Sequence, residues 1–126
     1  METPDTLRYS SDHEWVLLEG TTARVGITDY AQDALGDVVF VDITAGDTEV
    51  AAGGLLGEVE STKSVSEVYA PVPGRVTRVN TALADAPELL NSDPYGEGWI
   101  CEIAVDDVAS LDQLMDAASY ARLVEG

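Results

Sequence analysis

The chain has 126 residues, a length that predicts a single domain over 1–126 with a hydrophobic core of its own. It carries 24 Asp and Glu against six Lys and Arg, which gives a formal net charge of −18 at pH 7. A field of that sign repels phosphate backbones and anionic lipid surfaces, so we expect no nucleic acid and no membrane among its partners. The same acidity is typical of a solvated surface whose charge repels other copies of the chain, so we expect a monomer. Protein partners should present basic or neutral faces to it.

The N-terminal segment "METPDTLRYSSD" lacks the basic start and the apolar stretch of a secretory signal. No later segment reaches the roughly 18 consecutive apolar residues of a membrane span. We therefore expect a cytoplasmic protein without a transit peptide, and the excess of arginine over lysine suggests a bacterial or salt-tolerant source.

Strand patterns dominate the first hundred residues. Short runs rich in β-branched and aromatic residues are separated by turn-forming segments such as "EGTT" and "TAGD". Seven such runs occur, at 14–18, 23–27, 37–43, 55–61, 64–70, 74–79 and 99–105. Short runs with short connections predict a mainly β fold, an antiparallel sandwich or a flattened barrel.

A short helix is predicted inside the strand region. The stretch "TDYAQDALG" offers Thr28 or Asp29 as the N-cap, and Gly36 ends the pattern. The stretch "NSDPYG", in contrast, is interpreted as a structural turn over 91–95, in which Pro94 fixes the backbone.

A second helical pattern fills the tail, over about 107–124. Ser110 and Gln113 have the spacing of a capping box. The apolar residues that follow share one helical face, and they are Leu111, Leu114, Met115 and Ala118. We expect the helix to continue through a further turn with Tyr120, Leu123 and Val124 and to lie against the sheet.

The single cysteine and the single histidine do not suggest catalysis. Cys101 lies in a strand-like run, which predicts a buried, inert thiol, and one cysteine makes neither an intramolecular disulfide nor a zinc site. His13 has no partners for a triad or a metal set, so we assign it no role as a base. A hydrolase that uses the carboxylates of Glu58 and Glu60 is an alternative, but 24 acids produce such pairs by chance.

Lys63 is the only lysine of the chain. It stands at the tip of a predicted hairpin over about 55–70, where a turn of two or four residues would pair "GEVES" with "SVSEV". Downstream, "APVPG" contains two prolines and Gly74, which end the second strand. An exposed lysine is usually only solvated. An enzyme that acylates this chain on a side-chain amine, however, has no other lysine to modify, so from the residues alone both interpretations stay open.

Four ordered motifs resemble the lipoyl carriers of the glycine cleavage system, the H-protein family. They are "HEW" at 13–15, "VGITDYAQDALGDVVFV" at 25–41, "GEVESTKSVSEVYAPVPG" at 57–74 and "NSDPYGEGWI" at 91–100. The resemblance covers almost the whole chain and implies a lipoyl/biotinyl-carrier-like barrel-sandwich hybrid. Biotin carriers place methionines beside their lysine, where this chain has Thr62 and Ser64. Lipoyl domains of the 2-oxoacid dehydrogenases usually read Asp-Lys-Ala and lack the first and last motifs.

The resemblance implies a carrier and not an enzyme. Lipoate would be attached to Lys63 by lipoate-attaching enzymes, and the lipoyl group would receive the aminomethyl group of glycine from glycine decarboxylase, a pyridoxal-phosphate enzyme. An aminomethyltransferase would take the carbon, and dihydrolipoamide dehydrogenase would reoxidise the dithiol. A lipoyl donor that relays lipoyl groups to other carriers is an alternative that the sequence does not separate from this function.

The resemblance also implies roles for particular side chains. A cleft glutamate of the family falls on Glu14, which would contact the amine of the loaded arm, while the neighbouring Trp15 is interpreted as a core residue. The residues by which the lipoate-attaching enzymes recognise the family correspond to Glu60, Glu67 and Gly74. The alternative interpretation is that both glutamates are merely solvated strand residues and that Gly74 only forms a turn. Some relatives have a histidine where this chain has Ala34, so any contact of that histidine with the arm is missing here. No metal site is expected.

Overall fold

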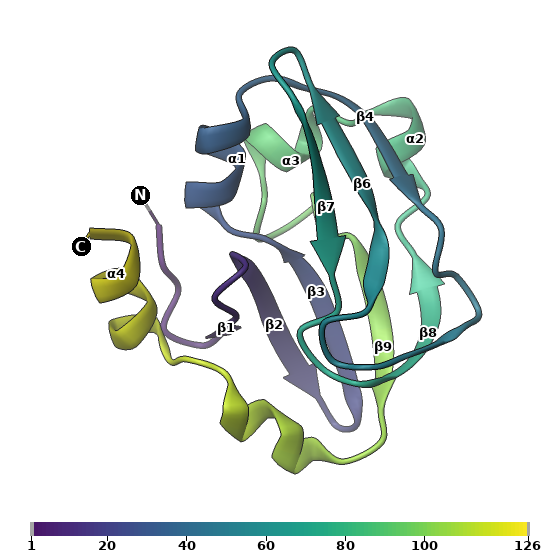
Figure 1. Ribbon diagram of the computed structural model, residues 1–126, viewed down its shortest axis with the longest axis vertical. Helices are drawn as coiled ribbons and strands as arrows, with labels where there is room; N and C mark the ends of the chain where they lie inside the picture. Colours follow the sequence, from purple (N-terminus) through teal and green to yellow (C-terminus); the bar gives the residue numbers. More distant parts are fainter. Residues whose placement is uncertain (1, 126) are drawn as a thin grey trace.

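The computed structural model describes residues 2–125, and its strands form two antiparallel sheets (Figure 1). A six-stranded sheet has the order β1-β2-β3-β9-β8-β5, and a three-stranded sheet has the order β4-β6-β7. The strands are β1 (Arg8–Tyr9), β2 (Glu14–Glu19), β3 (Thr22–Ile27), β4 (Val38–Ile43), β5 (Glu49–Val50), β6 (Leu55–Ser61), β7 (Val65–Tyr69), β8 (Gly74–Val79) and β9 (Cys101–Val105). The mainly β class is confirmed, and each predicted run contains a strand. The sequence missed only β1 and β5, which are too short to show an alternating pattern.

The hydrophobic core lies between the two sheets. Alternate residues of their strands point inward, and Val59, Val76 and Ile103 are fully buried. Burying such a side chain stabilises the fold by about 1.5–3 kcal/mol. Cys101 belongs to the same core, and burial raises the pKa of its thiol to about 12, as expected for the predicted inert cysteine.

Over residues 2–125, five short helices connect or flank the strands. They are α1 (Asp29–Leu35), α2 (Ala82–Asp85), α3 (Leu89–Ser92), the 3-10 helix η1 (Val108–Gln113) and α4 (Ala117–Glu125). The predicted internal helix is α1. The hydroxyl of Thr28 accepts a hydrogen bond from the Ala31 N–H at 3.2 Å, so Thr28 is the N-cap, and Gly36 ends the helix at φ 82°.

The predicted turn at 91–95 is only partly correct, because Asn91 lies in helix α3. Its side chain connects three segments. The amide oxygen accepts from the Val38 N–H at 2.8 Å, and the amide nitrogen donates to the Gly36 carbonyl at 2.9 Å. The Pro94 carbonyl accepts from the indole N–H of Trp15 at 2.9 Å. This segment therefore fixes the end of α1 and the start of β4, in line with a structural role.

The helical tail predicted over about 107–124 is present as two helices, η1 and α4, but an uninterrupted helix from Ser110 is wrong. η1 begins earlier, with the Asp107 carboxylate accepting from the Ala109 N–H at 3.0 Å, and the Ser110 hydroxyl is buried without a hydrogen-bond partner. Met115 then pairs with Tyr9 of β1 through backbone hydrogen bonds of 2.8 and 2.9 Å. This extended pairing interrupts the helical pattern and divides the tail into η1 and α4.

Helix α4 packs against the fold through Tyr120, as predicted, but Ala118 does not belong to its buried face. Ala118 is exposed, whereas Ala117 and Tyr120 are buried in a second, smaller hydrophobic cluster. That cluster also contains Tyr9 and Trp15, so the predicted core position of Trp15 is confirmed. The rings of Tyr9 and Tyr120 are stacked, with centroids 4.7 Å apart.

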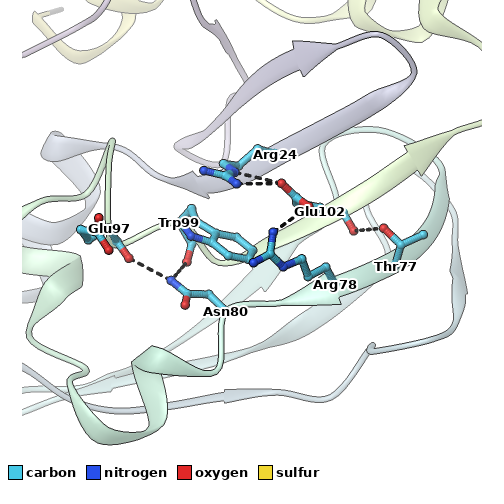
Figure 2. A network of polar contacts seen from close by, with 7 residues as sticks. All are labelled: Arg24, Thr77, Arg78, Asn80, Glu97, Trp99 and Glu102. Atoms are coloured by element: carbon cyan, nitrogen blue, oxygen red, sulfur yellow. Dashed lines mark hydrogen bonds and ion pairs between the residues drawn. The ribbon is translucent and has the colours of Figure 1, made fainter.

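The outer face of the six-stranded sheet is held by an ionic and aromatic network (Figure 2). Arg24, Glu102 and Arg78 lie in one row across β3, β9 and β8. Arg24 donates twice to Glu102, at 2.9 and 3.0 Å, and both guanidinium groups lie over the Trp99 ring, 4.6 and 5.1 Å from its centre. Arg24 and Arg78 therefore pair with residues of this chain, and these contacts help to hold the three strands in register.

Candidate functional site

The tip of the β6–β7 hairpin is a two-residue turn that presents Lys63. The N–H of Ser61 donates to the Ser64 carbonyl at 2.8 Å, so Thr62 and Lys63 form the loop. The Ser61 hydroxyl accepts from the N–H groups of Lys63 and Ser64, at 3.2 and 3.1 Å. The Thr62 N–H donates to the carbonyl of Asp37 at 3.1 Å, which ties the turn to the start of β4. The backbone under Lys63 is therefore fixed, while its side chain is exposed.

The stem of Lys63 lies over Gly36, the residue that ends α1. A Cβ added to Gly36 would lie 2.8 Å from Cε and 3.4 Å from Nζ of Lys63. Glycine is favoured here by its φ of 82°, and a methyl group at this position would displace the flexible end of the Lys63 side chain. In Figure 1 the tip of the hairpin is at the top, above α1 and next to the loop that leads from α1 to β4.

A cleft of about 270 Å³ lies between α1 and β7. β7 is an edge strand of its sheet. The walls are mainly apolar, and they comprise Ile27, Ala31, Ala34, Leu35, Val59, Val65 and Val68, with Ser64, Ser66 and Glu67 along β7. Ser64 directly follows Lys63 in the sequence, and we call the end of the cleft at Ser64 its outer end.

The opposite end of the cleft, which we call the inner end, is polar. It is formed by Asp12, His13, Glu14 and Tyr30. The carboxylate of Glu14 accepts a hydrogen bond from the N–H of Tyr69, the last residue of β7, at 3.3 Å. The inner end therefore lies one strand length away from the hairpin turn.

Glu14 is a buried carboxyl group with a strongly perturbed pKa. Its side chain is 2% exposed, and burial raises its pKa from 4.5 to about 7. Two donors oppose this effect, the Ser10 hydroxyl at 2.6 Å and the Tyr69 N–H. Glu14 is thus divided between its charged and neutral forms near pH 7, and a cation placed beside it would favour the charged form.

The other side chains of the inner end strengthen this preference for a cation. Asp12 adds a second carboxylate. Burial lowers the pKa of His13 below its usual 6.5, against the opposing charge of Asp12, so the imidazole is neutral at pH 7. The inner end of the cleft therefore offers negative charge without a competing positive group.

The structure separates the remaining predicted site residues. Glu60 and Glu67 are exposed on β6 and β7, and Glu67 also lines the cleft. Gly74 is buried at the start of β8 and does not line the cleft, and a Cβ there would lie 2.2 Å from the Ala104 carbonyl oxygen. The position of Ala34 is exposed on the cleft wall, where its methyl group leaves open space.

Sequence reasoning missed the side chains that hold the inner end together. Ser10 lies four residues before Glu14, and its Oγ also accepts the Glu14 N–H at 3.1 Å. Tyr120 comes from the C-terminal helix, and its hydroxyl is 2.8 Å from Nδ1 of His13. The serine spacing was visible in the sequence, but nothing local to residue 120 points to residue 13.

Comparison with known proteins decides the family. The sequence profile of the family Glycine cleavage H-protein matches residues 7–126. The chain belongs to this family. It is 58% identical to the glycine cleavage system H protein of Micrococcus luteus, with 94% of each chain covered, and 54% identical to that of Nocardia farcinica, with 98% of each covered. A probable glycine cleavage system H protein of Haloarcula marismortui is 53% identical, again with 98% of each chain covered.

The fold comparison agrees with the H-protein family. The crystal structure of a glycine cleavage system H protein from Mycobacterium marinum matches with a TM-score of 0.88 and 40% identity. The match covers 98% of this chain and 99% of that one. The family predicted from the four motifs and the barrel-sandwich fold class are therefore confirmed.

Over 2–125, no group of three or more His, Cys, Asp or Glu side chains could hold a metal ion. None of the helices in this range is long and apolar enough to span a membrane.

Proposed function

We propose that the protein is a lipoyl carrier that shuttles the aminomethyl group of glycine on Lys63. In this role it receives the group from glycine decarboxylase, delivers it to the aminomethyltransferase and is reoxidised by dihydrolipoamide dehydrogenase. The observation that supports the proposal most is the cleft that begins at Ser64, next to Lys63, and ends at the buried Glu14. The carrier itself performs no catalytic step.

The residues around Lys63 fit an arm attached to Nζ. The stem already lies over Gly36, where the missing Cβ provides the space that it occupies. From there the apolar wall formed by Ala34 and Leu35 of α1 leads along the cleft. The seven residues of α1 rise about 1.5 Å each, so this wall is on the order of 10 Å long and suits an extended aliphatic chain.

The chemistry assigned to the attached group is that of a cyclic disulfide. A lipoyl group, when attached, accepts the aminomethyl carbon on one sulfur while the other sulfur is reduced to a thiol. A carbon between sulfur and nitrogen hydrolyses readily in solvent, and the apolar side chains along the cleft would help to shield it from water. The chain also contributes a charge at the inner end.

Glu14 gives the cleft a preference for the loaded lipoyl arm over the unloaded one. An aminomethyl group carries an ammonium near neutral pH, and this cation would pair with the Glu14 carboxylate. The pairing offsets the desolvation that raises the carboxyl pKa to about 7. An uncharged arm gains nothing from Glu14 and is free to leave the cleft, as a shuttle requires.

Lipoate attachment is proposed to depend on Glu60, Glu67 and Gly74. Both glutamates are exposed on the strands of the hairpin that carries Lys63, where a basic attaching enzyme could contact them. The buried Gly74 would act indirectly, because its lack of a side chain lets β8 approach β9.

The proposal is tested by the intact mass of the protein made in cells supplied with lipoate. We expect one lipoyl increment on the native chain and none on Lys63→Arg, and we expect the lipoylated native chain to be loaded by glycine decarboxylase with glycine. An unmodified native chain in the presence of a competent attaching enzyme would overturn the carrier assignment.

Recognition is tested in the same cells with Glu60→Gln and Glu67→Gln. Each should lower the lipoylated fraction. The matched control is Glu58→Gln, which removes an exposed carboxylate from the same face of β6. An equal fraction in all three variants would argue against recognition through these two positions.

A further inference from the structure

His13 occupies an unusual position at the inner end of the cleft. Its φ of 70° lies in the left-handed region, which residues with a Cβ seldom adopt. The backbone is held there, because its N–H donates to the Ser10 carbonyl at 3.2 Å and its carbonyl accepts from the Thr28 N–H at 3.0 Å. This conformation brings the imidazole to the cleft, with its centre 4.8 Å from the Tyr30 ring.

The hydroxyl of Tyr120 joins the two sides of the inner end. It lies 2.8 Å from Nδ1 of His13, in the loop before β2, and 2.7 Å from Oγ1 of Thr28. Thr28 is the N-cap of α1, and its Oγ1 also accepts from the Ala31 N–H. One hydroxyl therefore connects a cleft-lining ring to the start of the helix that forms the opposite wall.

Tyr120 itself is held rigidly. Its side chain is 1% exposed, and its ring is stacked on Tyr9 with the two planes only 9° apart. Ala117, one turn earlier in α4, is buried in the same cluster. The position of the hydroxyl is thus set by the packing of α4 against β1.

We propose that Tyr120 is a positioning residue of the carrier cleft, whose hydroxyl fixes the His13 ring against the start of α1 and so closes the inner end around the cargo. The inference rests on the proposed function for the identity of the cargo. The contact itself is a property of the unmodified chain. The C-terminal helix thereby acquires a role in protecting the cargo.

Removal of the hydroxyl has a defined consequence. In Tyr120→Phe the stacked ring remains, but Nδ1 of His13 and Oγ1 of Thr28 both lose a partner. Thr28 is fully buried, so its hydroxyl would have to find another partner. The imidazole would no longer be held in one orientation, and water could reach the amine beside Glu14.

A matched control exists in the same aromatic cluster. The Tyr9 ring forms the other half of the stack, and its hydroxyl donates to the Pro4 carbonyl at 2.6 Å, away from the cleft lining. Tyr9→Phe removes one buried tyrosine hydroxyl, as Tyr120→Phe does, and leaves His13 untouched. Any difference between the two variants therefore reports on the cleft.

The first readout uses the unmodified protein. His13 is the only histidine, so the ring nitrogen signals in a 15N NMR spectrum belong to it without further assignment. We expect these signals to shift in Tyr120→Phe, because the ring loses the contact that selects its tautomer, and to stay in place in Tyr9→Phe. Unchanged signals in Tyr120→Phe would overturn the proposal.

The second readout is the first-order hydrolysis of the aminomethyl cargo on the lipoylated protein. We expect Tyr120→Phe to hydrolyse it roughly threefold to tenfold faster, the factor that corresponds to one net hydrogen bond, and Tyr9→Phe to match the native rate. If Tyr120→Phe fails to fold, His13→Asn serves instead, because asparagine tolerates the left-handed conformation and removes the ring.

The outcomes separate the two proposals. A native protein that takes up no lipoate, or that leaves its cargo as labile as a free lipoyl compound, refutes the proposed function and with it the protective role of Tyr120. Protection in the native protein that is fully retained by both Tyr120→Phe and His13→Asn overturns only the positioning role.

Discussion

Replacing Glu14 by glutamine should make the stability of the protein less dependent on pH. Burial raises the pKa of this carboxyl from 4.5 to about 7. At about 1.4 kcal/mol per pH unit, the interval between these values corresponds to roughly 3 kcal/mol. The folded state binds the Glu14 proton more tightly than the unfolded chain does, so the native protein loses this stability as pH rises through 7.

Urea unfolding of the two proteins at pH 5 and pH 8 measures the effect. We expect the free energy of unfolding of Glu14→Gln, relative to the native chain, to rise by about 2–3 kcal/mol between these pH values. Glu60→Gln is the control, because it removes an exposed carboxylate that is solvated in both states. A difference for Glu14→Gln that stays constant within about 0.5 kcal/mol would refute the desolvation argument.

Two further predictions concern the residues around the cleft. Ser10→Ala should raise the pKa of Glu14 further, because the 2.6 Å hydrogen bond to its carboxylate is lost, whereas Ser10→Thr should preserve it. The 13C signal of the carboxyl carbon reports this pKa, and an equal value in both variants would contradict the role of Ser10. Gly36→Ala should cost about 1 kcal/mol or more of stability and also lower the lipoylated fraction, since the new methyl group displaces the Lys63 stem. Gly20→Ala places the same methyl at a φ of 63° with no atom within 4 Å, so it should cost stability but leave lipoylation unchanged.

Local patterns predicted the parts of the fold that local forces decide. The sequence predicts the strand runs and the helix end at Gly36, and it narrows the N-cap to Thr28 or Asp29, because β-branched residues, capping side chains and a glycine act within a few positions. The hairpin was readable without Asn-Gly at its turn. The Ser61 side chain accepts the N–H groups of the turn and so stabilises it. The turn residues Thr62 and Lys63 do not need the positive φ that favours Asn-Gly, because the non-glycine residues with positive φ over 2–125 are His13 and Asp47.

Contacts between distant segments decide the parts that were mispredicted. The tail pattern had helical spacing throughout, but backbone pairing of Met115 with Tyr9 overrides it. Asn91 was assigned to a turn, whereas its amide is needed by the end of α1 and the start of β4, more than fifty residues earlier. Of the cleft itself, the sequence indicated Lys63 at one end and Glu14 at the other. The spacing of Ser10 and Glu14 is visible in the sequence, but nothing near residue 120 points to its contact with His13.

The contact between His13 and Tyr120 joins positions 107 residues apart, and this separation imposes an order on biosynthesis. The hairpin that carries Lys63 depends on pairing between neighbouring segments, so it can form while the ribosome is still translating the rest of the chain. The inner end of the cleft has to wait until α4 has emerged. A nascent chain therefore displays the attachment lysine before it possesses a finished compartment, and a ribosome stalled before α4 would present a carrier that has its lysine but cannot shelter cargo.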